Sequence, residues 1–406
     1  MSSEDSRIAI VGGGPSGLVI AIALARRGIG TTVFERDQHP DVAPRFSPDR
    51  SYTIDISGHG LKAIRHIDAA ASFDRRMIPF KGLKLPDGSS SEWTLPGWTG
   101  SRGDILRSLI EPIAARHADL VRFRFEARIE RADVRAGALT YTSASGETVT
   151  ETYDLMIGAD GAGSVVRESI CEQVPGFTVE RGSYPNYCTM IELDRVGGGM
   201  DKHYLYGLAT RPFCVAGAIR GDAGGDSVRW FCAVGTRQEQ RFSSTDEARA
   251  YLRRRVPRVL DFTSDEKLAA YAKRPCYHIG RTLRCSQLYG AKAVLLGDAS
   301  ASFPPIGQGV NAAMESAMTL DQCIGEAGTS PEGLAEAARR YSARWKPEAD
   351  AVAWMAVKSL FENRLHMLRA AITAKLGISI FEDAKSAEIP WSAVRSKALR
   401  RWPLWA

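Results

Sequence analysis

Three glycines and one glutamate near the start of the chain have types and spacing that could bind phosphates and a ribose. Gly12, Gly14 and Gly17 form a G-x-G-x-x-G pattern. The first glycine permits a tight turn, the second lets a pyrophosphate approach the backbone, and the third lets a helix pack against a strand. Glu35 follows 18 positions after Gly17, where its carboxylate can accept hydrogen bonds from ribose hydroxyls. The pattern therefore predicts a dinucleotide site.

Neighbouring side chains fit the same interpretation. Pro15 and Ser16 lie inside the glycine-rich turn, and we include them in the predicted site. Arg36 follows Glu35, and its guanidinium can lie on an adenine ring or pair with a phosphate, which suits FAD. The alternatives are a strand-to-helix turn without a ligand and a solvated arginine. We favour a bound dinucleotide because the strand, the helix and the acidic residue all stand where the motif requires them.

The elements that must position these residues follow from the hydrophobic pattern. Residues 8–11 form a short apolar run typical of a buried parallel strand, and the residues after the glycines have one apolar helical face. A second strand over 31–34 ends at the glutamate. Two later stretches, 154–167 and 293–315, again place an apolar strand before a glycine-rich turn and a helix. The chain therefore has three strand-to-turn stretches.

Composition places the chain among ordinary globular proteins. Its 406 residues suffice for two domains and an extension, and 44% hydrophobic with 25% charged residues argue against disorder. The net charge of +6 is spread along the chain, so we expect no nucleic-acid surface. This charge would help to attract an anionic nicotinamide cofactor or a carboxylate substrate. The seven cysteines lack C-x-x-C spacing, so no zinc or other metal site is expected.

The cysteines and the apolar stretches predict a cytoplasmic protein without a membrane span. An odd, scattered set of cysteines indicates reduced thiols. The polar stretch 1–6 is too short for a signal or transit peptide before the first strand. The apolar stretch 367–381 is interrupted by Arg369 and Lys375 and is too short to cross a bilayer.

The middle of the chain has the pattern of a second sheet. From 184 to 291 short strands alternate with polar turns, with one helix inserted over 245–256, which predicts a mostly antiparallel sheet. Residues from 331 onward have apolar positions at helical spacing. A three-stranded meander is expected over 121–134, 138–142 and 147–153.

We therefore predict an α/β protein with a Rossmann-like FAD-binding domain, a second, mostly antiparallel sheet domain for the substrate and a C-terminal helical region. The FAD-binding domain is expected to be assembled from three separated segments, 1–75, 101–183 and 292–330. A substrate-domain hairpin over 76–100 lies between the first two of these segments. The substrate domain itself is expected over 184–291, and the C-terminal helices over 331–406.

In this order, the three stretches resemble the class A FAD-dependent monooxygenases, the aromatic hydroxylases built on the p-hydroxybenzoate hydroxylase fold. The first stretch resembles the segment that binds the ADP half of FAD in that family. The second resembles the family's D-G motif, with Asp160, Gly161 and Arg167. For Asp160 we favour a structural role that braces the cofactor loops. Arg102, which opens a helix capped by Ser101, matches a family arginine that contacts the flavin cofactor.

The third stretch resembles the family's G-D motif, which implies contacts with the flavin. Asp298 follows a strand end, where its carboxylate can accept a hydrogen bond from the ribityl chain; a helix-capping aspartate is the alternative. Pro304 and Pro305 have no N–H and can form a wall of the flavin site. The N–H groups that open the next helix would stabilise negative charge on the reduced flavin. The residues assigned to this loop and helix start are Gly307, Gly309, Val310 and Asn311.

Within the family, the chain looks nearest to kynurenine 3-monooxygenase-like enzymes. The segment from Arg50 to Gly60 resembles their R-S-I-N-L…S-x-R-G segment, and the loop 303–312 resembles their P-P-F-G-Q-G-M-N-A loop. The first likeness implies that Arg50 belongs to the cofactor site. Residues 361–367 resemble their late N-x-x-E-M segment, which implies that Asn363 lies near the substrate.

The resemblance implies an FAD-dependent monooxygenase that hydroxylates a small aromatic molecule of kynurenine-like, anthranilic, phenolic or indolic type. In this family NADPH or NADH reduces the flavin, and dioxygen then forms a flavin C4a-hydroperoxide that attacks the ring. The cofactor supplies this chemistry, so the protein must orient the ring and exclude water, and we expect no catalytic acid or base. No second dinucleotide pattern follows a strand, which favours class A enzymes over flavoproteins with a separate nicotinamide domain.

Aromatic residues on the predicted second sheet are candidates for the substrate site, although such residues are more often packed in a core. Alternatives for the function are a flavin-dependent oxidase or dehydrogenase, a halogenase of the same fold, and a non-catalytic flavoprotein that binds an aromatic ligand. The W-x-W-x-I-P motif of halogenases is absent. We expect a monomer or a homodimer. The substrate-site candidates are Tyr204, Tyr206, Phe213, Trp230 and Pro304, with Asn363 from the late segment.

Overall fold

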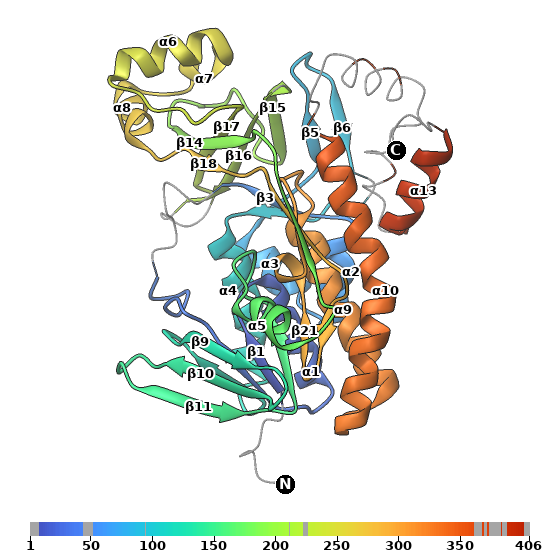
Figure 1. The fold of residues 1–406 in the computed structure, drawn as a ribbon. Helices are drawn as coiled ribbons and strands as arrows, with labels where there is room; N and C mark the ends of the chain where they lie inside the picture. The colour runs from blue at the N-terminus through green and yellow to red at the C-terminus, as the bar shows by residue number, and fades with distance from the viewer. Residues whose placement is uncertain are drawn as a thin grey trace.

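A six-stranded sheet carries the first glycine-rich turn (Figure 1). Its strands, in spatial order, are β20 (Tyr289–Gly290), β21 (Ala293–Leu295), β12 (Leu155–Gly158), β1 (Ile8–Val11), β2 (Thr31–Phe34) and β8 (Val121–Arg124). The structure is a computed structural model that describes residues 8–43, 52–93, 95–210, 212–221, 226–360 and 388–401, with single positions at 368, 372 and 383. β1, β12 and β21 are buried and apolar, as a parallel sheet covered on both faces requires.

The three glycine-rich turns follow neighbouring strands of this sheet. β1 pairs in parallel with β12, and β12 pairs in parallel with β21, so the carboxyl ends of these strands meet at one edge. Open α/β sheets bind their ligands outside the carboxyl ends of the strands. The topology therefore brings three motifs that are far apart in sequence to one place, and it confirms the predicted α/β fold.

Helices pack against this sheet and against one another (Figure 1). α1 is buried along most of its length and packs against α4 and α9. α9 in turn contacts α2 and the long helix α10. The helices are α1 (Pro15–Arg26), α2 (His59–His66), α3 (Ala70–Arg76), α4 (Arg102–Arg116), α5 (Val165–Gln173), the 3-10 helix η1 (Gly297–Ala299), α9 (Gly309–Ala327) and α10 (Pro331–Lys358).

The expected meander differs from the prediction in its first strand. The single strand expected over 121–134 is divided into β8, which pairs in parallel with β2 in the six-stranded sheet, and β9 (Arg128–Asp133). The division falls at Glu126, whose φ of 54° turns the chain out of an extended conformation. β9 then pairs in antiparallel fashion with β10 (Ala138–Thr142), which pairs with β11 (Thr148–Thr152).

A seven-stranded sheet forms the second body, which lies at the top of Figure 1. Most of its neighbouring strands are antiparallel, as predicted, but β5 and β15 pair in parallel. One face packs against helices and the other faces the first body. The strands, in spatial order, are β18 (Tyr277–His278), β14 (Tyr187–Leu193), β17 (Val228–Thr236), β16 (Phe213–Arg220), β15 (Tyr204–Thr210), β5 (Gly82–Lys84) and β6 (Ser90–Glu92).

Three helices cover one face of this sheet, whereas the sequence predicts only one helix in this region. The expected helix is α6 (Thr245–Arg255), and α7 (Arg258–Asp261) and α8 (Asp265–Lys273) follow it. α7 is a single turn beginning after Pro257, and α8 is capped by Ser264, whose side chain accepts a hydrogen bond from the amide of Lys267. Such short helices have too few apolar positions to give a clear periodic signal.

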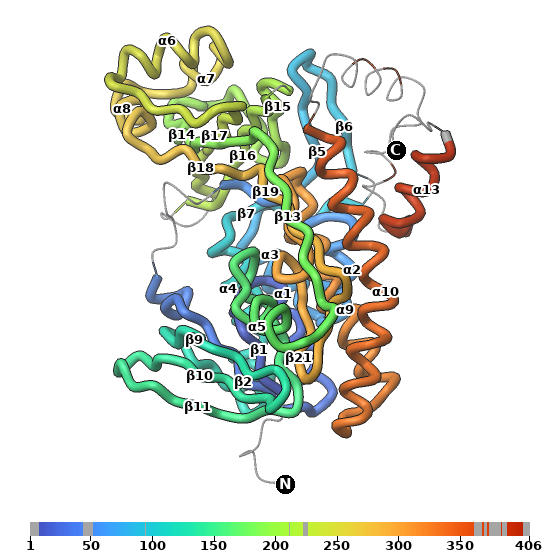
Figure 2. The backbone as a smooth tube through the Cα atoms, in the orientation of Figure 1, coloured from blue at the N-terminus to red at the C-terminus, as the bar shows by residue number. Residues whose placement is uncertain are grey.

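Two paired strands connect the bodies. β13 (Val179–Ser183) and β19 (Arg281–Cys285) pair in antiparallel fashion and run side by side between the two sheets (Figure 2). β19 also pairs with β22 (Ala301–Ser302), beside the third glycine-rich turn. A small sheet of β3 (Ile54–Ile56), β7 (Trp98–Gly100) and β4 (Ile78–Pro79) lies near the start of α4.

The C-terminal region of the described chain is helical. α13 (Trp391–Arg401) packs against α10. Among the helices that the structure describes, none combines the length and the apolar character needed to cross a membrane. The described residues also contain no group of three or more His, Cys, Asp or Glu side chains arranged to hold a metal ion.

Candidate active site

The first glycine-rich turn requires glycine at two positions for steric reasons. Gly12 has a φ of +106°, and a Cβ atom there would lie 2.4 Å from the carbonyl oxygen of Ala159. A Cβ atom at Gly17 would lie 2.0 Å from the carbonyl oxygen of Gly12. At Gly14, by contrast, a Cβ atom would meet only the Ala159 carbonyl oxygen, at 4.0 Å. The space next to Gly14 is therefore open and lies directly at the start of α1.

The start of α1 has the properties of a phosphate site. Gly14 is the N-cap and has no side chain to cap the helix, and Pro15 is the first helical residue. The amide N–H groups of Ser16 and Gly17 belong to the first turn, where an α-helix provides no carbonyl partner. These donors and the helix dipole favour an anion. The open space at Gly14 thus fits the pyrophosphate of a dinucleotide.

Glu35 is fixed at the end of β2, beside this turn. Its Oε2 accepts a hydrogen bond from the amide of Gly13 at 2.7 Å, and its Oε1 accepts one from the amide of Asp37 at 2.9 Å. Each carboxylate oxygen keeps a further lone pair for a ribose hydroxyl. The next residue, Arg36, is exposed. The structure therefore places the residue predicted to bind the ribose next to the helix start.

Asp160, in the second motif, accepts a hydrogen bond from the start of α5, whose N-cap is Ser164. Its Oδ2 accepts a hydrogen bond from the amide of Val165 at 2.7 Å, at the start of α5. Its Oδ1 is buried and has no hydrogen-bond partner among the described residues. Burial raises the pKa of Asp160. This geometry supports the bracing role that we favour for Asp160.

Arg167 joins the second motif to the third. Its side chain is buried, and Nη2 donates to the carbonyl oxygen of Ala162 at 2.8 Å. Nη1 donates to the carbonyl oxygen of Ala299, in the third motif, at 3.2 Å. One buried guanidinium therefore holds the two turns at a fixed spacing, although Arg167 and Ala299 lie 132 positions apart in the sequence.

Asp298 lies in η1, directly after the end of β21. Its side chain is accessible to solvent. The surrounding protein desolvates the carboxyl only in part but raises its pKa to about 6, and the charge of Arg102 opposes this rise. Arg102 is exposed at the start of α4, where Ser101 and Asp104 form a capping box. The structure thus brings together two residues predicted to contact FAD from distant segments.

Asn311 acts through its side chain as well as through the helix start. The side chain is fully buried, and Nδ2 donates to the carbonyl oxygens of Asp55 at 3.1 Å and Gly307 at 3.2 Å. Oδ1 accepts from the amide of Ser57 at 3.1 Å. A Cβ atom at Gly60 would lie 2.1 Å from this Oδ1, which explains the glycine there. The third motif is therefore tied to β3.

Asp55 is a further residue of this site that the sequence reasoning did not single out. Its side chain is 5% exposed, and its Oδ2 accepts a hydrogen bond from the hydroxyl of Ser57 at 2.8 Å. Burial raises the pKa of Asp55 to about 6, and the Ser57 hydrogen bond opposes this rise. The available signal was an acidic residue at a central position of a strand pattern, between two isoleucines.

The loop before α9 leaves the helix start free of side-chain caps. Gln308 is the N-cap and makes no side-chain capping hydrogen bond, and a Cβ atom at Gly309 would meet no protein atom within 4 Å. The first-turn N–H groups at Gly309 and Val310 have no carbonyl partner within an α-helix. Pro304 is buried and Pro305 is exposed. This helix start therefore fits the expected contact with the flavin ring.

The predicted substrate residues on the second sheet lie on different faces. Tyr206 and Trp230 form an edge-to-face pair and belong to the core that the sheet shares with α6, α7 and α8. The Tyr204 hydroxyl donates a hydrogen bond to Oε1 of Glu92 at 2.5 Å. This contact joins β15 to β6, at the end of the sheet formed by the β5–β6 hairpin. The structure therefore does not place Tyr204, Tyr206 or Trp230 beside Phe213, so the predicted residues of the sheet do not form one site.

Phe213 lies on the opposite face, which looks toward β3. It packs with an apolar cluster that includes Met190 and Phe231. On the same face of β16, a Cβ atom at Gly217 would lie 2.8 Å from Cβ of Thr53, directly before β3. This face thus lies against the strand that Asn311 holds. The predicted contacts of Arg50 and Asn363 lie outside the described residues.

Comparisons with known proteins identify the family and several relatives of this chain. A family described as FAD binding domain matches residues 5–358. A kynurenine 3-monooxygenase of Salinispora tropica is 26% identical over 393 residues, which cover 92% of this chain and 84% of that protein. A kynurenine 3-monooxygenase of Candida albicans is 26% identical over 387 residues, which cover 89% of this chain and 82% of that protein.

Solved structures share the fold. The tetrameric form of 2-methyl-3-hydroxypyridine-5-carboxylic acid oxygenase superposes with a TM-score of 0.66 at 21% identity, over 87% of this chain and 90% of that chain. HpxO of Klebsiella pneumoniae, complexed with FAD and uric acid, superposes with a TM-score of 0.64 at 20% identity, over 96% of this chain and 97% of that chain.

Proposed function

Since the chain belongs to the FAD binding domain family and is an FAD-dependent monooxygenase, we propose that it uses NADPH or NADH and dioxygen to hydroxylate a small aromatic molecule. Candidate substrates are kynurenine-like, anthranilic, phenolic and indolic compounds. The observation that supports this most strongly is the meeting of three glycine-rich turns at one sheet edge, opposite an apolar face of the second sheet.

The residues of this edge fit FAD. The start of α1 would hold the pyrophosphate, and Glu35 the adenosine ribose. Asp298 would accept a hydrogen bond from the ribityl chain, and the start of α9 would lie at the flavin ring. The open spaces next to Gly14 and Gly309 support this assignment. When bound, FAD supplies the hydride and oxygen chemistry that amino acid side chains lack.

The protein's own contribution is orientation and exclusion of water. Phe213 is only partly buried and packs on the apolar cluster of Met190 and Phe231, so its ring would help to position an aromatic substrate over the flavin. An apolar wall also keeps water from the reacting atoms, and water would divert the reaction toward hydrogen peroxide. We assign no catalytic acid or base.

The remaining assignments belong to the same proposal. We propose that the residues predicted to bind FAD and substrate do so, that the chain is divided into the six predicted segments, and that the protein is a cytoplasmic monomer or homodimer. Tyr206 and Trp230 belong to the core that the sheet shares with α6, α7 and α8, on the face opposite to Phe213.

The test is oxidation of NADH and NADPH by the purified, FAD-loaded protein, with and without kynurenine, tryptophan, anthranilate and simple phenols. Peroxide is measured in parallel. We expect one compound to stimulate oxidation with little peroxide. Turnover without a nicotinamide would favour an oxidase or dehydrogenase, and a halogenated product in the presence of halide would favour a halogenase. Binding of an aromatic compound without flavin reduction would favour a ligand-binding flavoprotein.

A further inference from the structure

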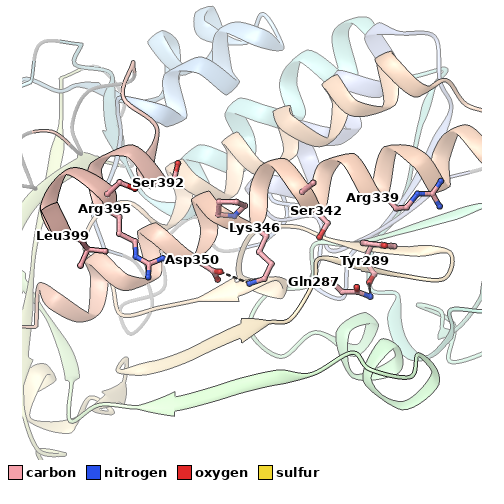
Figure 3. A pocket seen from close by; sticks show the side chains of 12 residues that line it. Gln287, Tyr289, Arg339, Ser342, Lys346, Asp350, Ser392, Arg395 and Leu399 are labelled. Carbon is pink, nitrogen blue, oxygen red and sulfur yellow. Dashed lines mark hydrogen bonds and ion pairs between the residues drawn. The ribbon is translucent and has the colours of Figure 1, made fainter. Parts of the chain in front are cut away.

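A pocket of about 730 Å³ lies between α10, α13 and β20 (Figure 3). None of its lining residues belongs to the three glycine-rich turns. α10 contributes positions 339, 342, 346 and 350, which lie on one helical face. α13 contributes positions 392, 395 and 399 by the same spacing, and Tyr289 of β20 lines the remaining side.

The charges of α10 in this pocket are already paired. Lys346 Nζ lies 2.7 Å from Oδ2 of Asp350, and Arg284 Nε donates to Oδ1 of the same carboxylate at 3.2 Å. Arg339 Nη2 lies 2.9 Å from Oε2 of Glu336. A new anion would therefore gain little from these cations, because each already has a carboxylate partner.

Arg395 of α13 differs from them. Its Nε is buried from solvent and has no hydrogen-bond partner among the described residues. Its guanidinium carbon lies 5.9 Å from the centre of the Trp354 ring, which supports the cation from one side. Since Nε is inaccessible, a ligand in the pocket would meet the terminal Nη groups of Arg395, which have no carboxylate partner among the described residues. An unpaired guanidinium that lines a pocket favours an anionic ligand.

The pocket is also lined by a main-chain carbonyl that lacks its usual helical donor and by an apolar surface. Pro347 has no N–H, so the carbonyl oxygen of Ala343 lacks the hydrogen bond that a helix normally supplies four residues later. Both residues line the pocket, together with Leu399 and Tyr289. These side chains form a surface on which a planar ring can pack.

We propose that this pocket binds a small aromatic carboxylate, whose carboxylate accepts hydrogen bonds from Arg395 and whose ring packs against the apolar lining. The planar guanidinium matches a carboxylate in a bidentate geometry. The ligand would contact α10 and α13 together and would hold them against each other.

Binding there would also stabilise contacts near the predicted flavin site. Trp391, the first residue of α13, is fully buried and donates from Nε1 to Oε2 of Glu315 at 3.1 Å. Its ring stacks on His59 with 4.0 Å between ring centres. His59 begins α2, two positions after Ser57, which binds Asn311. The ligand would therefore slow hydrogen exchange over 391–401.

The test uses the full-length, FAD-loaded protein and benzoate as the probe. Calorimetry measures benzoate binding, with benzamide as an uncharged compound of the same shape. We expect Arg395→Gln to weaken benzoate binding roughly tenfold or more, because a charge-assisted hydrogen bond is lost. Arg400→Gln, on the exposed side of α13, should bind benzoate like the unchanged protein. Arg395→Lys keeps the positive charge but lacks the paired, coplanar donors of a guanidinium, so it should give an intermediate affinity.

Flavin absorbance distinguishes benzoate bound in this pocket from benzoate bound in the substrate site next to the flavin. Benzoate near the flavin would change the flavin spectrum, and that change should be the same in Arg395→Gln. Equal benzoate affinity of Arg395→Gln and the unchanged protein, or equal binding of benzoate and benzamide, would overturn the proposal. Neither result depends on whether the protein hydroxylates an aromatic compound.

Discussion

The amide of Ser57 donates a hydrogen bond to Oδ1 of Asn311 at 3.1 Å, across 254 positions of the sequence. The same asparagine donates to the main chain of Asp55 and Gly307. One buried amide group therefore holds β3 against the loop that precedes α9. Since that loop presents the helix start assigned to the flavin ring, the position of the predicted cofactor depends on this contact.

Asn311→Ala should destabilise the protein and weaken FAD binding together. The substitution leaves the buried amide of Ser57 without an acceptor, which costs about 2–3 kcal/mol in the free energy of unfolding. Urea unfolding and FAD titration of the apoprotein measure the two effects. Gln308→Ala is the matched control, because its side chain makes only a 3.4 Å contact with Asn311. Equal stability of the two variants would contradict the account.

Two glycines of the first turn should separate folding from cofactor binding. Gly17→Ala places a Cβ atom 2.0 Å from the carbonyl oxygen of Gly12, so the free energy of unfolding should fall by about 3 kcal/mol or more. Gly14→Ala meets no protein atom closer than 4.0 Å, so the apoprotein should keep its stability. Its FAD dissociation constant should nevertheless rise roughly tenfold or more, equivalent to about 1.4 kcal/mol. Unchanged FAD affinity of Gly14→Ala would show that the pyrophosphate does not lie there.

Asp55 should make the stability of the apoprotein depend on pH. Its pKa of about 6 lies above the usual value of 3.8, so the folded state binds the proton more tightly than the unfolded state. Stability is then lost as the pH rises from about 4 through 6, by up to about 3 kcal/mol. Asp55→Asn should remove this loss, so the variant should be the more stable protein at pH 8.

Urea unfolding between pH 4.5 and 8 measures this pH dependence. Asp87→Asn is the control, because Asp87 is exposed and its hydrogen bonds with Ser89 lower its pKa. Parallel pH profiles for the unchanged protein and Asp55→Asn would show that Asp55 does not titrate in this range.

Trp391 should determine how firmly α13 is held. Trp391→Phe keeps a ring on His59 but loses the hydrogen bond to Glu315, which should cost about 1 kcal/mol. Trp391→Ala removes the ring from a fully buried position and should cost about 3–5 kcal/mol. Hydrogen exchange over 391–401 should accelerate in that order. Similar exchange in all three proteins would mean that α13 is held by other contacts.

The sequence predicts local structure well wherever a motif has steric demands. The turn at Gly12 and Gly17 forms as expected, because no larger side chain fits beside the neighbouring carbonyl oxygens. The predicted helix start at Arg102 is also correct, because Ser101 and Asp104 form a capping box. In both cases the signal lies within a few residues of the feature that it predicts.

Long-range pairing is the aspect of the fold that the sequence does not predict. Nothing local shows that Val121–Arg124 pairs with β2 rather than extending the meander. The sequence also does not show which side chains of a strand face the first body. Trp230 and Phe231 are neighbours that point to opposite sides of the sheet, and both are aromatic. Asp55 was missed for a related reason, because the contact that ties it to the third motif is a hydrogen bond from Asn311 to its main-chain carbonyl oxygen.

The most direct test of the central claim is the fate of dioxygen. FAD-loaded protein is supplied with NADPH or NADH, the aromatic panel and ¹⁸O₂, and the products are analysed by mass spectrometry. We predict one aromatic product that carries a single ¹⁸O atom, formed in step with nicotinamide oxidation. Full conversion of the labelled dioxygen to hydrogen peroxide, with every aromatic compound unchanged, would contradict the assignment as an aromatic hydroxylase.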